Sequence, residues 1–212
     1  MKYLHALQEL IFPSRCLGCS TLGLSICSQC RQGWHPHIYR TFSRDAERFP
    51  IYSSIAYSPI ASKVLLAAKE RNRIQADQLI LEALKRSITH CLKEVGSGLL
   101  IPIPSRISIA RLRGRQFVAD MSYQLSDLVG APTFEILTHA RKVKDQSTLD
   151  AKARSRNLDG SMKALRYVSG KAILIDDLVT SGATLHEAAR ALREKGIDVA
   201  AAVTACVAEP LR

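Results

Sequence analysis

Apolar and polar positions follow two alternating patterns from about residue 51 onward. Short, largely apolar runs predict β-strands over residues 51–58, 98–104, 134–140, 171–178 and 197–207. Between these runs, apolar residues recur every three or four positions, which predicts helices over residues 62–69, 74–95, 108–129 and 181–196. The last of these helices ends at Gly196, a residue type that commonly closes a helix.

This alternation of strands and helices predicts an α/β fold with a mostly parallel sheet flanked by helices. In such sheets, ligands bind beyond the carboxyl ends of the strands. Asp176 and Asp177 directly follow the apolar run Ala172–Ile175. We therefore expect both acids to emerge at the edge of the sheet where ligands bind.

The first 50 residues follow a different pattern and predict a small N-terminal unit. Apolar residues at helical spacing predict a short helix at its start: Tyr3, Leu4, Leu7, Leu10 and Ile11. A cluster of cysteines comes next, and a polar connector with aromatic residues, 33–50, leads to the first predicted strand. We therefore divide the chain into residues 1–50, with the helix, cysteine module and connector, and residues 51–212, with the α/β domain.

Four cysteines in the N-terminal unit form two CxxC pairs, Cys16 with Cys19 and Cys27 with Cys30. Two such pairs can converge on one tetrahedral Zn²⁺, and a segment with so few apolar residues could hardly fold without the binding energy of a metal. Two disulfides or a redox-active pair are the alternatives. A zinc ion held by four thiolates has no open position for chemistry, so its predicted role is structural or in binding a partner.

The remaining candidate metal ligands and thiols have simpler interpretations. His35 and His37 stand close enough in the sequence to replace a cysteine ligand, but four cysteines already complete a closed site, which favours surface positions for both histidines. Cys91 and Cys206 fall in a predicted helix and a predicted strand, and we interpret them as buried free thiols.

Composition adds an electrostatic and a cellular expectation. The formal net charge is +11, from 30 Lys and Arg against 19 Asp and Glu, and basic residues concentrate in residues 106–115 and 141–156. Such an excess favours polyanionic partners, for example phosphorylated ligands or nucleic acid. The first segment lacks the cleavage site of a signal peptide, and no apolar run approaches the roughly 18 residues of a membrane helix. The sequence therefore predicts a cytoplasmic protein without a membrane span.

The stretch ILIDDLVTSGATLHEA, residues 173–188, carries the most specific local chemistry. Its two acids are followed by small and hydroxyl-bearing residues where a helix begins: Thr180, Ser181, Gly182, Ala183 and Thr184. Consecutive backbone N–H groups and the positive end of the helix dipole make such a turn a cradle for a phosphate. The acids could accept hydrogen bonds from a sugar diol or approach a hydrated Mg²⁺. A ribose 5-phosphate with a further anionic group fits this layout.

The same stretch also has a purely structural interpretation. An aspartate can cap the turn that follows it, and Thr180 or Ser181 can act as the N-cap of the helix. The local sequence leaves both interpretations open.

The segment AILIDDLVTSGATL, residues 172–185, resembles the signature of type I phosphoribosyltransferases, which bind 5-phosphoribosyl-1-diphosphate (PRPP). The resemblance implies that Asp176 and Asp177 contact the ribose 2′ and 3′ hydroxyls and that residues 180–184 hold the 5′-phosphate. It also implies a sheet of the type I phosphoribosyltransferase kind and Mg²⁺ bound together with PRPP.

A narrower resemblance, to the ComF family of competence-associated phosphoribosyltransferase-like proteins, covers nearly the whole chain. It rests on the order of the four-cysteine module, a PIPSR…RLRG segment, a Q-x-x-L-x(4)-R-x-x-N segment and the PRPP motif. The matching positions of the two middle segments are Pro102, Pro104, Arg113, Gly114, Gln146, Leu149, Arg154 and Asn157. The family usually follows its Arg-Gly with Phe-Asn-Gln, whereas this chain has Arg115-Gln116-Phe117, so no role is carried over to that triplet.

By the resemblance to type I phosphoribosyltransferases, residues 103–106 take the place of the loop that grips pyrophosphate, with Ser105 and Arg106 as candidate contacts. A strand end that leads into a helix can also bind an anion on physical grounds alone. A surface arginine after a proline-terminated strand is the alternative.

Two further basic segments are candidates for contacts with the diphosphate. Lys142, Lys144 and Arg154 stand where the family has a hood loop, which could close over the diphosphate and place a cation on the leaving group. A solvated basic surface is the alternative for this stretch. Residues 69–73 could add diphosphate contacts, or could simply be the end of a helix.

Two functions of different classes follow. The first is Mg²⁺-dependent transfer of the phosphoribosyl group from PRPP to an acceptor that the sequence does not identify, with no residue marked as general base. The second, implied by the ComF resemblance, is a PRPP-responsive protein that holds single-stranded DNA and acts with the DNA-uptake machinery in natural transformation. Trp34, Tyr39 and Phe42 are its candidate stacking residues, and packing against neighbouring residues is their alternative role.

Overall fold

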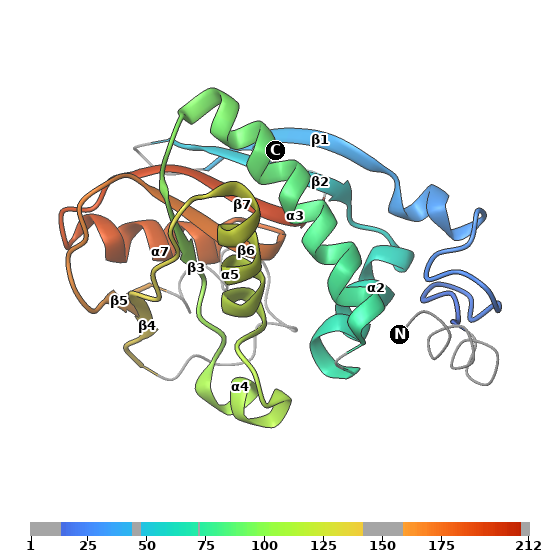
Figure 1. The fold of residues 1–212 in the computed structure, drawn as a ribbon. Helices are drawn as coiled ribbons and strands as arrows, with labels where there is room; N and C mark the ends of the chain where they lie inside the picture. The colour runs from blue at the N-terminus through green and yellow to red at the C-terminus, as the bar shows by residue number, and fades with distance from the viewer. Residues whose placement is uncertain (1–13, 44–47, 72, 142–158, 209–212) are drawn as a thin grey trace.

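The computed structural model describes residues 14–43, 48–71, 73–141 and 159–208 (Figure 1). The helix predicted over residues 3–11 lies outside these ranges. So do the hood-loop candidates Lys142, Lys144 and Arg154.

A five-stranded sheet forms the centre of the described structure, in the order β1-β2-β7-β6-β3. Its strands are β1 (Pro36–Phe42), β2 (Pro50–Ala56), β7 (Val199–Val207), β6 (Ala172–Val179) and β3 (Leu99–Pro102). Strands β2, β7, β6 and β3 run parallel, and β1 pairs antiparallel with β2 at one edge. The predicted mostly parallel sheet is therefore confirmed.

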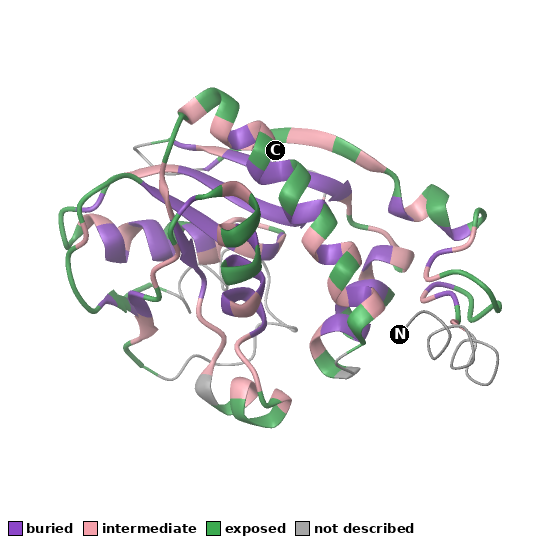
Figure 2. Cartoon of the chain, in the orientation of Figure 1, coloured by how far each residue is buried: buried purple, intermediate pink, exposed green. Residues whose placement is uncertain are grey.

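Helices cover both faces of this sheet (Figure 1). On one face, α2 (Pro59–Arg71), α3 (Ile74–Val95) and α5 (Phe117–Val129) share an apolar core with Ile173 and Ile175 of β6. On the other face, α7 (Ala183–Arg193) packs against Ala172 and Leu174. Alternate residues of β6 therefore serve two cores, and buried positions fill the middle of the molecule (Figure 2).

A small second sheet lies against α7. It pairs β4 (Leu137–His139) with β5 (Met162–Ala164), and the buried carboxylate of Glu187 on α7 accepts a hydrogen bond from the Met162 N–H, at 2.7 Å. Arg190 holds the same carboxylate through its Nε (2.7 Å) and donates to the Met162 carbonyl (2.8 Å). These bonds fix the strand that precedes β6 to the helix that follows it.

The structure corrects two predicted elements. The helix predicted over residues 108–129 is interrupted, because α4 (Ile107–Arg113) ends at Gly114, whose φ of 70° turns the chain out of the helix before α5 begins. Residues 36–42, which we placed in a connector, form β1. An edge strand needs no continuous apolar run, because solvent reaches part of it. The division of the chain at residue 50 stays a prediction.

Candidate functional site

The two acids lie within β6, near its carboxyl end, rather than beyond it. The strand continues to Val179, and Asp176 pairs in register with Thr204 of β7. Successive residues of a strand point to opposite faces, yet the Asp176 carboxyl group folds back toward Asp177 and stays in hydrogen-bond contact with it. Asp177 shares the α2 and α3 face with Ile175, whereas Asp176 shares the α7 face with Leu174. The strand thus extends past both acids, and their shared role at the ligand-binding edge of the sheet stays a prediction.

Asp177 is held by a lysine from a different element. Its side chain is only 7% exposed, and Oδ2 forms an ion pair with Nζ of Lys69, near the end of α2. Burial alone would raise the pKa of Asp177, but the ammonium group of Lys69 outweighs it and holds the pKa below its ordinary value. Burial alone would lower the pKa of Lys69, but the carboxylate keeps that pKa raised. Both groups are therefore charged at neutral pH.

Asp176 is in a different electrostatic state. Its Oδ1 accepts a hydrogen bond from the Asp177 N–H at 2.9 Å. Burial and the neighbouring charge of Asp177 raise the pKa of Asp176 well above its ordinary value. A hydrogen-bond donor or a cation supplied by a ligand would therefore stabilise the ionised carboxylate of Asp176.

The loop after β6 forms a small hollow beside Asp176. The hollow is lined by Asp176 and by Leu178 to Leu185. Gly182, with a φ of 76°, is the N-cap residue of α7, and no side chain caps this helix. The interpretation of Thr180 or Ser181 as the N-cap is therefore wrong. The first N–H groups of α7 have no partner within the helix, so they and the nearby hydroxyls can serve an anion in the hollow.

The loop after β3 lies next to the acids, because β3 pairs with β6 and places Pro102 opposite Ile175. Ser105 and Arg106, the pyrophosphate candidates, are both half-buried there. The Ser105 backbone N–H already donates to Oε1 of Gln116, at 3.2 Å. The loop thus lies beside the site, and one of its N–H groups is already hydrogen-bonded to another side chain of the protein.

The triplet in which the chain departs from the ComF pattern supports this region. Arg115 forms two hydrogen bonds to the Asp77 carboxylate, at 2.7 and 2.8 Å, and one to the Ala68 carbonyl. Gln116 holds Ser105, and Phe117 is buried. The triplet therefore fastens the start of α5 to α2, α3 and the loop after β3.

Sequence reasoning missed two residues at the site. The sequence predicts for Lys69 either a contact with diphosphate or a place at a helix end, and the acid that it pairs with, Asp177, is far away in the sequence. His139 on β4 was not considered at all; its Nε2 lies 3.0 Å from the Pro104 carbonyl, and burial lowers its pKa. No sequence pattern signals a contact between a short strand and a distant loop.

The four predicted cysteine ligands converge in space. Their Sγ atoms all lie within 4.8 Å of one another, and Cys19 and Cys27 are 3.6 Å apart. Four sulfurs bound to one zinc ion at about 2.3 Å would be separated by about 3.8 Å. The Cys27 N–H also points at Cys16 Sγ (3.4 Å), and the Cys30 N–H at Cys27 Sγ (3.5 Å). The cluster can hold a zinc ion.

The other cysteine predictions can be compared with this geometry. All six cysteines are free thiols, which does not match the alternative of two disulfides. Cys91 and Cys206 are fully buried, as expected. His35 and His37 are exposed and do not belong to the described cluster.

Comparison of the sequence with known protein families gives one match. Residues 107–210 match the family model of the phosphoribosyl transferase domain. This match includes Asp176, Asp177 and the loop after them, but neither Lys69 nor the cysteine cluster. The matched part of the chain is similar to that domain. No curated protein matches the chain.

Solved phosphoribosyltransferases are similar to the chain at low identity and low TM-score. One is an adenine phosphoribosyltransferase, with 11% identity over 87% of this chain and 92% of that chain and a TM-score of 0.43. Another is the orotate phosphoribosyltransferase of Aeropyrum pernix, with 15% identity, coverage of 79% and 73%, and a TM-score of 0.41. The adenine phosphoribosyltransferase of Saccharomyces cerevisiae has 12% identity, coverage of 88% and 92%, and a TM-score of 0.42.

Proposed function

We propose that this phosphoribosyltransferase-like chain binds PRPP together with Mg²⁺ and transfers the phosphoribosyl group to an acceptor that is not yet identified. The observation that carries this proposal is the hollow at the carboxyl end of β6. There, Asp176 and residues 180–184 face one small space. The phosphoribosyl transferase family match includes all of these residues.

The residues of the hollow suit the two ends of a ribose phosphate. The loop of residues 180–184 offers backbone N–H groups and hydroxyls to the 5′-phosphate. The pKa of Asp176 is raised without a ligand. Ribose hydroxyls or a hydrated cation near its carboxyl group would stabilise the ionised form. Lys69 keeps Asp177 ionised, and because this pair is neutral overall, the carboxyl group of Asp176 is the one that a bound cation would ionise.

In the proposed reaction, the bond between ribose C1 and the pyrophosphate oxygen breaks, and the acceptor forms a new bond to C1. Mg²⁺ bound with PRPP supplies neutralisation of the charge that develops on the leaving pyrophosphate. The positions of Ser105 and Arg106 beside β6 support their contact with that diphosphate. Lys142, Lys144 and Arg154 remain proposed contacts from the hood loop.

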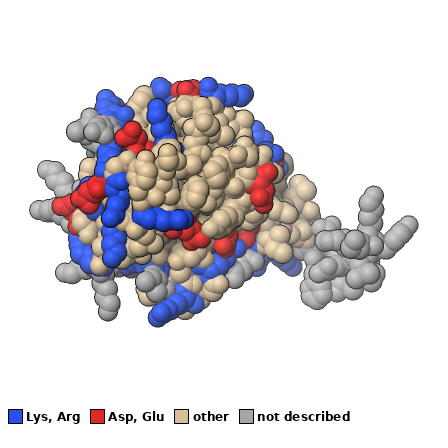
Figure 3. Space-filling model, turned by 60° about the vertical axis from the view of Figure 1, so that its left-hand side comes forward, with Lys and Arg blue, Asp and Glu red and all other residues tan. Residues whose placement is uncertain are grey.

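The ComF resemblance proposes a biological setting: a cytoplasmic protein of competence and DNA uptake, with single-stranded DNA and the uptake machinery as partners. Support for it comes from the motif order in the sequence. Two of its candidate stacking residues have other contacts, since Trp34 is 3% exposed and Phe42 lies beneath the guanidinium of Arg40 (4.7 Å). On the face drawn in Figure 3, basic side chains are interspersed with acidic ones. Among the described residues, no helix is long and apolar enough to cross a membrane.

Calorimetric titration of the zinc-loaded protein with PRPP and Mg²⁺ tests the proposal. We expect saturable binding that Asp176→Asn, Asp177→Asn abolishes. The matched control is Asp127→Asn, Asp198→Asn, which removes two exposed carboxylates outside the site and should leave binding unchanged. Absence of binding by the wild-type protein, or equal loss in both double variants, would contradict PRPP recognition at β6.

A further inference from the structure

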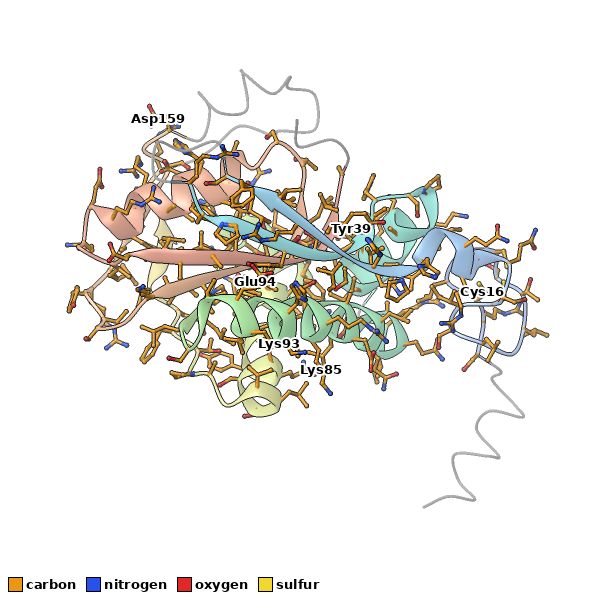
Figure 4. All side chains as sticks on the ribbon, turned by 90° about the horizontal axis from the view of Figure 1, so that it is seen from above. Cys16, Tyr39, Lys85, Lys93, Glu94 and Asp159 are labelled. Carbon is orange, nitrogen blue, oxygen red and sulfur yellow. The ribbon has the colours of Figure 1, made fainter. Side chains whose placement is uncertain are left out.

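A second hollow of the molecule lies away from the β6 site. It is a groove of about 580 Å³ between α3 and the start of β1, which we call the α3–β1 groove. Its lining includes Lys85, Arg86 and Lys93 of α3 together with Pro36, His37 and Ile38 of β1. Figure 4 labels Lys85 and Lys93 along α3, and Tyr39 on β1.

The groove carries positive charge that the described residues do not neutralise. Lys85 and Lys93 are exposed, and neither makes an ion pair within the described parts of the chain. Glu94, next to Lys93 in the sequence, already receives a hydrogen bond from Tyr52 (2.8 Å) and pairs with Arg40 (3.1 Å). Glu82 is the acid that lines the groove. The exposed pair of Arg86 with Glu82, at 3.9 Å, is weak.

Strand β1 also offers unused hydrogen-bonding groups. Among the described strands it pairs only with β2, so its other side is an edge. The Ser43 N–H donates to the Phe49 carbonyl, at 2.9 Å, in register with the pairs of Thr41 and Tyr39. Because bonded and non-bonded pairs alternate in an antiparallel ladder, the N–H and C=O groups of residues 40 and 42 face away from β2. Such an edge can accept another strand.

We propose that the α3–β1 groove binds an acidic segment of a partner protein, which adds to β1 as a further strand. Lys85 and Lys93 are eight residues apart on one helix, about 12 Å along its axis. Acidic side chains four residues apart on one face of an extended strand are separated by about 13 Å. The spacing of the two lysines therefore matches an extended acidic chain that lies along β1.

The surroundings of the groove favour a peptide over single-stranded nucleic acid. Base stacking needs free aromatic faces. Arg40 lies over one ring, that of Phe42 (4.7 Å), and Arg48 lies near the same ring at 5.2 Å. The ring of Tyr39 is in edge contact with His37, at 5.1 Å between centroids. A strand edge, in contrast, is recognised by a polypeptide backbone.

Fluorescence anisotropy with a labelled octapeptide of alternating glutamate and valine tests this proposal on the full zinc-loaded chain. We expect saturable binding, weakened roughly tenfold by Lys85→Glu, Lys93→Glu, because two attractions become repulsions. The control Lys171→Glu, Lys195→Glu makes the same change in net charge at exposed positions outside the groove and should leave the affinity unchanged. A second octapeptide of the same sequence, N-methylated at every peptide bond, keeps the charge but lacks backbone N–H donors and should bind weakly.

Three outcomes would overturn the proposal. Equal weakening by both double variants would show a response to net charge alone, and equal binding of the two peptides would exclude strand addition. Binding of oligothymidylate in preference to the acidic peptide, with loss in Lys85→Glu, Lys93→Glu, would assign the groove to nucleic acid. Circular dichroism of each variant establishes that the fold is retained.

Discussion

Replacing Lys69 by methionine tests the ion pair that connects α2 to the β6 site. Methionine keeps the apolar stem but removes the charge opposite Asp177, whose side chain is 7% exposed. Breaking a buried ion pair on one side costs about 3–5 kcal/mol. The Lys69 side chain is still 25% exposed, so water can reach part of the pair, and we expect a loss near about 3 kcal/mol in the free energy of unfolding.

A double variant separates the pair interaction from the effect of each substitution. Lys69→Met, Asp177→Asn removes both charges, so we expect it to be more stable than Lys69→Met alone. Chemical denaturation followed by circular dichroism measures the four proteins of this cycle. A loss of about 3 kcal/mol would lower the melting temperature by roughly 6–12 °C in a chain of this size.

The loss in Lys69→Met should depend on pH in a defined direction. In the wild-type protein the pKa of Asp177 is below its ordinary value, so its contribution is present above about pH 4 and is lost as the pH falls through the folded-state pKa. In the variant, burial acts unopposed and we expect the pKa to rise above the unfolded-state value. The protonated form then favours folding, and stability is lost as the pH rises through the raised pKa. The difference in the free energy of unfolding between the wild-type protein and Lys69→Met should therefore be larger at about pH 8 than at about pH 5.

The control for this series is Lys171→Met, which removes an exposed lysine far from the pair and should change stability little. Equal stability of wild type and Lys69→Met at about pH 8 would refute the reasoning. So would a double variant whose loss equals the sum of the two single losses, because the two residues would then be uncoupled.

Three further predictions concern the loop, the cysteine cluster and α7. Gly182→Val places a β-branched residue at a φ of 76°, so we expect loss of PRPP affinity in calorimetry, whereas Gly196→Ala, at a positive φ outside the site, should lower stability but not affinity. Cys19→Ser, Cys27→Ser should abolish binding of one zinc ion per chain, measured by metal analysis after dialysis, while Cys91→Ser should retain it. Glu187→Leu leaves the Met162 N–H and Arg190 without their buried partner, and we expect a loss of about 2–4 kcal/mol in denaturant unfolding. An unchanged midpoint would contradict that role.

The sequence predicts the parts of the fold that depend on local pattern. The apolar run before Asp176 and the helical spacing after Gly182 are strong enough to place β6 and α7 within a few residues. The two CxxC pairs likewise predict the four-cysteine cluster, since the ligands of each pair are sequence neighbours. Local spacing is sufficient for these features because each is decided within a short segment.

Other features depend on contacts between distant segments. Strand β5 has three residues, too few for a periodic pattern, and is held by Glu187 of α7. The sequence of the edge strand β1 predicts a polar connector, because much of this strand faces solvent and carries polar side chains. The pairing of Lys69 with Asp177 follows only from the position of α2 on the same face of the sheet as Asp177, which no short stretch of sequence reveals.

Helix α2 connects the cysteine module to the proposed PRPP site. Near its first turns, Ser58 donates to the Gly33 carbonyl (2.5 Å) and Lys63 donates to the Gly18 carbonyl (2.6 Å). Near its last turn, Lys69 holds Asp177 of β6. The cysteine module and the charge state of the site are therefore supported by the two ends of one helix. A structural zinc ion placed here would stabilise more than its own module, because the helix that it braces also positions the lysine that keeps Asp177 ionised.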